Sequence, residues 1–352
     1  MTVVVVGAGL GGIAAARALV AAGQTVRVLD RGHRVGGRMG ARTVDGRAVD
    51  VGASYFTVPE PDPEPDPDAD THRREAGAAA AARAFADVVA DWERRGVARR
   101  WTDTFATAGP DGLSGSKQGP LRWGAPGGLR STVEDLATGL AVQNPVVVAG
   151  VRRDGDGLTV DAEPATAVVL AMPDAQALRL VTGPDGEPAA GLADVAAALT
   201  RASAPQIAVA AGWAEREWPD FAGAFVNDSE VISWIADDGS RHGDGAAVLV
   251  AHATPALSAQ HLVDPDAVVD PVLTELARVL GTRTAPVWSS AKRWGLAKPT
   301  GRREQPYLIS DAALGAPVVV CGDGWGGPSK VAGAFVSGHR AGGALASRLM
   351  TP

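Results

Sequence analysis

Four consecutive valines, Val3 to Val6, lead directly into the glycine-rich segment Gly7-Ala-Gly-Leu-Gly-Gly12. An apolar strand followed by such glycines and then by an alanine-rich stretch is typical of the Rossmann βαβ unit. In that unit the chain turns tightly at Gly7, bare backbone approaches a pyrophosphate at Gly9, and helix packs on strand at Gly12. The pattern predicts a dinucleotide-binding site.

The residues after this unit supply the acid that such a site needs. Gly23 is placed to end the helix, because glycine adopts the left-handed conformation at little cost. A second apolar run, Val26 to Leu29, then leads to Asp30, whose carboxylate can accept hydrogen bonds from ribose hydroxyls. The alternative is a glycine-rich turn in another α/β protein, which the combination of strands, helix and acid disfavours.

Length and composition bound the remaining possibilities. A chain of 352 residues exceeds the size at which one core stops growing, so two domains are expected. The net charge of −7 offers no basic surface for nucleic acid. No apolar run approaches the roughly 20 residues that span a bilayer, and no signal peptide precedes the first strand, so we expect a cytoplasmic protein without a membrane partner. The histidine spacing and the single Cys321 predict no metal site.

The order of apolar runs predicts an α/β protein with two domains. The nucleotide-binding domain takes residues 1–58, 126–200 and 300–352, and a discontinuous α+β domain takes residues 59–125 and 201–299. The second domain is expected to contain an antiparallel sheet, with strands within Gln206 to Trp213, Ala224 to Ile235 and Ala246 to His252.

Two local signals precede these strands in the sequence. Ser131 and Glu134 form a capping-box pattern, which predicts a helix from Ser131 to Leu140. The segment Pro59 to Asp70 alternates prolines with acids, which predicts an exposed and mobile loop. Whether that loop covers a functional site is left open by the sequence.

Two further glycine clusters point to a flavin rather than to a nicotinamide cofactor alone. Gly36 and Gly37, followed by Arg38, let backbone and guanidinium approach a phosphate or a flavin edge. Near the other end, Gly322-Asp323 follows an apolar strand, which would place the acid at the edge of the sheet where ligands bind. A helix beginning near Ala334 can direct its N-terminal dipole at a flavin carbonyl.

Taken together, these motifs resemble the FAD-dependent amine oxidase superfamily. Four segments resemble its renalase-like branch, and they are Gly52 to Thr57, Trp123 to Leu129, Lys292 to Ala297 and Gly322-Asp323 with Ser337-Gly338. The resemblance runs nearly end to end, and it implies a Rossmann-type FAD-binding domain beside a substrate domain. It also implies FAD held without a covalent bond, because Cys321 precedes the Gly-Asp step and His33 belongs to the phosphate end.

The resemblance assigns residues to each part of the cofactor. The ADP half of FAD would be held by Gly7, Gly9, Gly12, Asp30, Arg31, Gly36, Gly37 and Arg38, with the Val146 backbone pairing with adenine. The ribityl chain and the flavin ring would be lined by Gly52, Ala53, Gly322, Asp323, Gly333, Ala334 and Phe335.

The substrate side departs from the family pattern. Monoamine and polyamine oxidases carry a lysine near flavin N5, and Ala208 falls at that position, which argues against an ordinary amine oxidase. Lys292 and Lys298 could reach the site from another strand, or they could be surface charges. The substrate-pocket candidates are Trp123, Trp294 and Trp325, since indoles stack on planar ligands, and their alternative role is core packing.

The resemblance implies an oxidase that accepts a hydride at flavin N5 from a dihydropyridine isomer of NAD(P)H, with O2 or another acceptor taking the electrons to give peroxide. One alternative is an amine oxidase or desaturase that acts on a small amine or a biosynthetic intermediate. Another is a non-catalytic FAD-binding protein. The substrate, the natural acceptor and the oligomeric state are left open.

Overall fold

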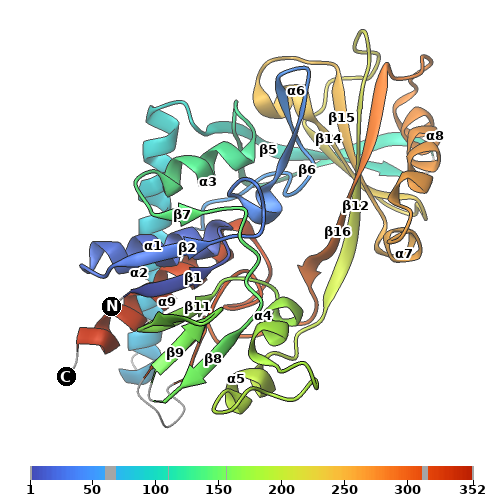
Figure 1. Ribbon diagram of the computed structural model, residues 1–352. Coiled ribbons are helices and arrows are strands. Elements are labelled where there is room, and N and C mark those ends of the chain that lie inside the picture. The colour runs from blue at the N-terminus through green and yellow to red at the C-terminus, as the bar shows by residue number, and fades with distance from the viewer. Residues whose placement is uncertain (1, 60–68, 110, 156, 311–315, 351–352) are drawn as a thin grey trace.

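The computed structural model describes residues 2–59, 69–109, 111–155, 157–310 and 316–350, with only the backbone for residues 69–76. Within these residues, two large sheets lie in separate halves of the molecule (Figure 1). One sheet is mainly parallel and belongs to the Rossmann-type half, and the other is mainly antiparallel and belongs to the second half. The predicted fold class is therefore confirmed.

The Rossmann-type half contains a six-stranded sheet in the order β17-β18-β11-β1-β2-β7. The strands are Leu308–Ser310 (β17), Val318–Val320 (β18), Ala167–Leu170 (β11), Val3–Val6 (β1), Val26–Leu29 (β2) and Val142–Gln143 (β7). Strand β1 lies between β2 and β11 in parallel register, and its four valines are all buried. A run of buried valines is what a parallel strand covered on both faces requires.

Different elements cover the two faces of this sheet. Successive strand residues point to opposite faces, so Val3 and Val5 join one core and Val4 and Val6 another. The first core is shared with α1 (Leu10–Ala21), α2 (Ala69–Arg94), α3 (Leu129–Ala137) and α9 (Val331–Met350). The second is shared with β8 (Val151–Asp154), β9 (Gly157–Val160), β10 (Glu163–Ala165), α4 (Asp174–Val181) and α5 (Ala193–Ala198).

The second half contains a seven-stranded sheet in the order β16-β12-β15-β14-β13-β5-β6. The strands are Trp288–Pro299 (β16), Ser203–Gly212 (β12), Val248–Ala253 (β15), Ile232–Asp237 (β14), Gly223–Val226 (β13), Arg99–Gly109 (β5) and Gly112–Gly124 (β6). All neighbours are antiparallel except β13 and β5, which are parallel. Strands β12 and β16 extend toward the Rossmann-type half (Figure 1).

One face of the seven-stranded sheet is covered by two helices, α7 (Pro255–Gln260) and α8 (Val269–Leu280). Its other face packs on the hairpin of β3 (Ala41–Val44) and β4 (Arg47–Asp50), which comes from the Rossmann-type half. Short helix α6 (Asp238–His242) follows β14 and lies near the same hairpin. This second face, which meets the β3–β4 hairpin, is called the inner face of the sheet.

The structure corrects the predicted capping box. Helix α3 begins at Leu129, its N-cap is Gly128, and no side chain within the turn caps it. Instead, Asp50 Oδ1 accepts the Leu129 N–H at 2.8 Å, and Ser131 Oγ donates to the Gly128 carbonyl at 2.8 Å. The predicted capping box was wrong because Asp50, which is distant in sequence, caps the helix in place of a local side chain.

Helix α2 packs against helices of the Rossmann-type half. It lies in the range assigned to the second domain, yet Phe85, Val89 and Trp92 are buried in the core shared with α1 and α9. The predicted acidic loop falls on residues 60–68, which lie outside the described residues, and its last two residues begin α2. Among the described residues, no helix is long and apolar enough to cross a membrane.

Candidate active site

The turn between β1 and α1 presents bare backbone at a helix N-terminus. Gly7 has a φ of +108°, and a Cβ on Gly12 would lie 1.9 Å from the Gly7 carbonyl oxygen, so both positions require glycine. A Cβ on Gly9 would meet no atom within 4 Å, and no side chain caps the first turn of α1. Free N–H groups beside open space are what a pyrophosphate needs.

Asp30 lies at the end of β2 and holds the neighbouring loops. Its Oδ2 accepts the Ala8 N–H and its Oδ1 accepts the Gly32 N–H, both at 2.6 Å. Each carboxylate oxygen has a further lone pair with which to accept a ribose hydroxyl. The Val146 N–H donates to the Asp30 carbonyl at 2.7 Å, so the predicted contact between Val146 and adenine would use the Val146 carbonyl oxygen. The side chain of Arg31 is exposed beside this turn.

The second glycine pair packs directly on the first. The Gly36 N–H donates to the Ala8 carbonyl at 2.9 Å, and a Cβ on Gly37 would lie 3.3 Å from the Gly9 Cα. Both Gly36 and Gly37 have positive φ values, 117° and 53°. This close approach puts Arg38 at the edge of the same turn.

Arg38 pairs with Asp323 from the other end of the chain. The Arg38 Nη2 lies 2.5 Å from Asp323 Oδ1, and Nη1 donates to Oδ2 at 3.1 Å. Ser329 Oγ donates to the same carboxylate at 2.6 Å, and Arg38 Nη1 also donates to the Ala297 carbonyl at 3.0 Å. The carboxyl-terminal Gly-Asp step is thereby fixed to the second glycine cluster.

The start of α9 crosses the start of α1 at very short range. A Cβ on Gly338 would lie 1.9 Å from the Gly11 carbonyl oxygen, and a Cβ on Gly11 would lie 3.0 Å from the Ala334 carbonyl oxygen. The Gly322 N–H donates to Ser337 Oγ at 3.0 Å. The N-terminal turn of α9, with Gly333 and Ala334, thus reaches the edge formed by the phosphate turn.

The segment after β4 completes this edge. The Ala53 N–H donates to the Arg38 carbonyl at 2.9 Å, and a Cβ on Gly52 would lie 2.1 Å from the same oxygen. Phe335, in contrast, is buried against Phe85, with 5.0 Å between the ring centroids. Phe335 therefore packs the core behind the edge, and its predicted contact with the flavin ring would come from its backbone.

These features fit FAD. The glycine cradle leaves open space at Gly9, and the uncapped helix faces that space. The structure brings together at one edge most of the predicted cofactor residues, which are Gly7, Gly9, Gly12, Asp30, Gly36, Gly37, Arg38, Gly52, Ala53, Gly322, Asp323, Gly333 and Ala334.

An aromatic cluster on the inner face of the seven-stranded sheet escaped the sequence analysis. The Phe105 ring lies 4.7 Å from Trp234 and 5.1 Å from Tyr55, measured between centroids. Arg122 stands over Phe105 at 4.1 Å, and burial raises the pKa of Tyr55. Tyr55 lies only two positions beyond Ala53, so this cluster forms an aromatic wall close to the predicted flavin edge.

The three candidate tryptophans lie in different surroundings. Trp123 is stacked on Phe56 at 6.2 Å and lines a groove of about 780 Å³ that also contains Lys330. Trp294 donates its indole N–H to the Val51 carbonyl at 2.7 Å. Trp325 is buried in the second core, beneath the guanidinium of Arg303 at 4.0 Å. That position favours the packing role for Trp325.

The two candidate lysines stand on β16. Lys292 is directly opposite Ala208 and Lys298 is opposite Ala204. Ala208 is buried, whereas both lysines are exposed. The Lys292 ammonium lies 5.1 Å from the centroid of the Trp294 ring, which is a cation–π distance.

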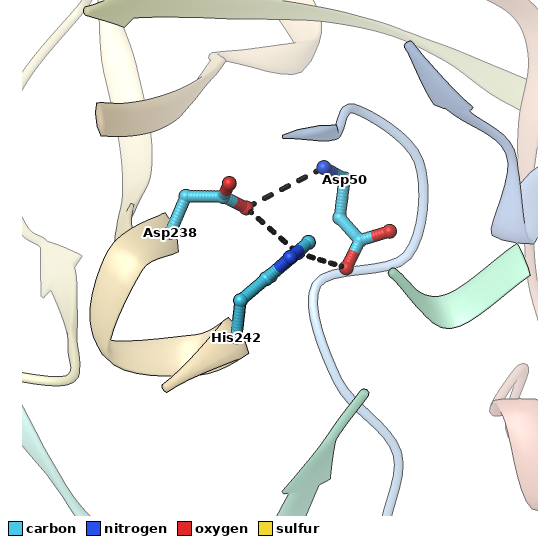
Figure 2. A group of neighbouring side chains, drawn as sticks. All are labelled: Asp50, Asp238 and His242. Atoms are coloured by element: carbon cyan, nitrogen blue, oxygen red, sulfur yellow. Dashed lines mark hydrogen bonds and ion pairs between the residues drawn. The ribbon is translucent and has the colours of Figure 1, made fainter. Parts of the chain in front are cut away.

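A buried cluster of charges joins the two halves beside this site (Figure 2). His242 Nε2 lies 3.1 Å from Asp50 Oδ2 and 3.5 Å from Asp238 Oδ1, and the three ligand atoms are close enough to hold a metal ion. However, Arg47 and Arg241 both pair with Asp238. Burial acts to raise the pKa of Asp238, but Arg241, His242 and Arg47 hold it below its usual value. The arginines balance the carboxylates without a metal.

The fold and this edge define the class of protein, a Rossmann-type FAD-dependent oxidoreductase. The model for flavin containing amine oxidoreductases matches residues 60–346, and a model for NAD(P)-binding Rossmann-like domains matches residues 5–65. The chain belongs to the flavin containing amine oxidoreductase family.

Two curated proteins are similar to short segments of this chain. Putrescine oxidase of Kocuria rosea is 54% identical over 55 residues, and phytoene desaturase of Rhodobacter capsulatus is 51% identical over 57 residues. Each match covers 16% of this chain and only 12% or 11% of the relative.

Among solved structures, a protein from Exiguobacterium sp. 255-15, provisionally named a protoporphyrinogen oxidase, superimposes with a TM-score of 0.66 at 15% identity, covering 98% of each chain. Putrescine oxidase bound to putrescine superimposes with a TM-score of 0.62 at 18% identity, covering 100% of each chain. At these identities the likeness supports the fold alone.

Proposed function

We propose that this protein oxidises dihydropyridine isomers of NAD(P)H in a renalase-like manner, with O2 as the electron acceptor. The observation that carries the proposal is Ala208, a buried alanine where amine oxidases of this family are expected to hold a lysine near the flavin. When bound, the flavin supplies two-electron chemistry, taking a hydride at N5 and passing electrons on to O2.

The chain's own residues then have to bind and orient a planar donor. The aromatic wall of Tyr55, Phe105 and Trp234 offers ring faces and edges for this purpose. A dihydropyridine becomes aromatic when it loses hydride, so no protein base is needed to remove a proton in that step. This reaction is therefore compatible with an alanine at position 208. An amine substrate, in contrast, is oxidised only when its nitrogen is neutral.

The second candidate is an amine oxidase or desaturase. It is favoured by the matched segments of putrescine oxidase and phytoene desaturase, although each match covers only 16% of this chain. In this case Lys292, opposite Ala208, is the residue that would stand in for the expected lysine. A cytoplasmic location and use of O2 remain predictions under either candidate.

The test is anaerobic mixing of the FAD-loaded protein with each class of donor. Dihydropyridine isomers of NAD(P)H are expected to bleach the flavin within one turnover, and admission of air should restore its colour with one peroxide per donor. Putrescine and other small amines should leave the flavin oxidised. Bleaching by amines alone would replace the first candidate with the second.

A further inference from the structure

Five side chains form one row across the seven-stranded sheet. In the backbone register Lys292 is opposite Ala208, Ala208 is opposite His252, His252 is opposite Trp234, and Trp234 is opposite Phe225. Directly opposed residues of antiparallel strands point to the same face of a sheet. That face is the inner one, because Ala208 packs with valines of β4 and of the segment after it.

His252 lies at the centre of this row, between Ala208 and Trp234. Its ring makes a hydrogen bond with the backbone of Gly52, a residue of the predicted flavin edge. Its Nε2 is inaccessible to solvent and has no hydrogen-bond partner among the described residues. The nitrogen that meets Gly52 is therefore Nδ1, and Nε2 is the atom left without a protein partner.

The protonation of His252 follows from these contacts. Burial lowers its pKa to about 4 and the charge of Arg241 acts in the same direction, while the bond to Gly52 opposes them. The imidazole is therefore neutral at pH 7. A histidine bond that raises the pKa is one in which the ring N–H donates to a carbonyl. With its one proton on Nδ1, the ring carries a lone pair on Nε2.

A buried acceptor without a partner is costly, so such an atom calls for a ligand that donates. Ala208 contributes only a methyl group beside His252, which leaves this part of the row without a competing protein donor from β12. Trp234 on the other side is aromatic and packs with Phe105 and Tyr55. The surroundings of Nε2 suit a flat ligand that carries an N–H group.

We propose that His252 Nε2 accepts a hydrogen bond from the carboxamide N–H of a dihydronicotinamide substrate, an inference that rests on the proposed function. Dihydropyridines of this kind carry a primary carboxamide, which has two N–H donors. His252 is then a substrate-binding residue that distinguishes carboxamides from other ring substituents.

The test compares two ligands that need no turnover. The FAD-loaded protein is titrated with nicotinamide and with 3-acetylpyridine, which keeps the ring and the carbonyl but lacks the N–H, and the visible flavin spectrum reports binding. Nicotinamide is expected to bind about tenfold or more tightly, because 3-acetylpyridine leaves Nε2 unpaired. His252→Phe should bring the ratio of the two dissociation constants close to one.

Two variants serve as controls. His252→Gln keeps a side-chain carbonyl as acceptor and should restore part of the preference. Trp234→Phe removes a different buried N–H from the neighbouring position and should keep the ratio, whatever it does to both affinities together. The two-ligand comparison in the unmodified protein stands even if a variant fails to fold.

Three results would overturn the proposal. They are a ratio near one in the unmodified protein, an unchanged ratio in folded His252→Phe, or no spectral change with either ligand. A loss of FAD affinity in His252→Phe with the ratio unchanged would instead assign Nε2 to the cofactor. Flavin bleaching by dihydropyridines alongside any of these results would leave the proposed function standing, and bleaching by amines alone would remove it.

Discussion

Arg38 and Asp323, 285 positions apart, form a two-point ion pair that fixes the carboxyl-terminal Gly-Asp step to the second glycine cluster. Their side chains are 30% and 13% exposed, so the pair is largely shielded from water. The pair joins the two segments that distinguish a flavin site from a plain dinucleotide site. We therefore expect FAD binding to depend on contacts between the two ends of the sequence.

Removing one partner of this pair should weaken both the fold and the cofactor site. Arg38→Met leaves Asp323 without its cation, and we expect the free energy of unfolding to fall by about 1–3 kcal/mol and the Kd for FAD to rise about tenfold or more. Arg94→Gln breaks the exposed pair with Asp91 and should change stability by no more than about 0.5 kcal/mol. Urea unfolding measures the free energy of unfolding, and FAD titration measures the Kd. Equal effects of the two variants would contradict the role given to the Arg38–Asp323 pair.

The crossing of α1 and α9 offers a matched pair of glycines on one helix. Gly338→Ala would place a methyl group 1.9 Å from the Gly11 carbonyl oxygen, so we expect a loss of about 1–3 kcal/mol in the free energy of unfolding. At Gly343 a Cβ would meet nothing within 4 Å, and Gly343→Ala should stabilise the helix by up to about 1 kcal/mol. Opposite signs in urea unfolding support the crossing, and a destabilised Gly343→Ala with a neutral Gly338→Ala would refute it.

The buried charge cluster should be sensitive to loss of its central cation. Arg241 is fully buried and pairs with Asp238, and it also donates to the carbonyls of Ser54 and Asp50. Arg241→Met removes this cation from two buried carboxylates, which is expected to cost about 3–5 kcal/mol. Thermal unfolding measures the loss, and a change below about 1 kcal/mol would show that the cluster is solvated.

Because of the same cluster, we expect the stability of the protein not to depend on metal ions. Because Arg47 and Arg241 already pair with Asp238, dialysis against EDTA or addition of Zn²⁺ should leave the Tm of the FAD-loaded protein unchanged. A rise in Tm that saturates at one Zn²⁺ per chain would place a metal among Asp50, Asp238 and His242.

Stability should fall in a defined acid range because of His252. Its pKa is about 4 in the folded protein against an ordinary value of 6.5, so the unfolded chain binds the proton more tightly. The stabilisation present above pH 6.5 is lost as the pH falls toward 4, by on the order of 3 kcal/mol. Between pH 6.5 and 4 the free energy of unfolding of His252→Gln should therefore change less with pH than that of the unmodified protein. His339, whose pKa burial also lowers, is present in both proteins, so their difference isolates His252.

Parallel curves for the two proteins between pH 6.5 and 4 would mean that the pKa of His252 is the same in the folded and unfolded states, which would contradict the lowered pKa. The comparison is made with urea unfolding at each pH, with FAD in excess. Asp238, whose pKa is lowered, loses its contribution only below its ordinary value of 3.8 and so acts outside this window.

Local patterns predicted the nucleotide-binding edge well. Strands β1 and β2 and the left-handed Gly23 are encoded by contiguous residues, and the structure has them where the sequence places them. Strand, turn and helix within about 30 residues leave little for distant residues to decide. The sequence also indicated the antiparallel sheet, because its strands are apolar runs separated by turns.

Features formed by segments that are distant in sequence could not be predicted from the sequence. Asp50 caps a helix that begins 79 positions later, which no local pattern near Ser131 indicates. The aromatic wall draws Phe105 from β5 and Trp234 from β14, and these two residues lie 129 positions apart in the sequence. His252 looked like any histidine at the end of an apolar strand, and only the register of β15 beside Ala208 sets it apart.

The most direct measurement is the absorption spectrum of the purified protein before and after precipitation with acid. The account predicts a yellow protein with an oxidised flavin spectrum, and release of all the flavin as FAD into the supernatant, because the one cysteine, Cys321, is buried with a pKa raised by burial to about 12. A protein that stays colourless after incubation with FAD would contradict the cofactor assignment, and flavin retained in the pellet would contradict non-covalent binding.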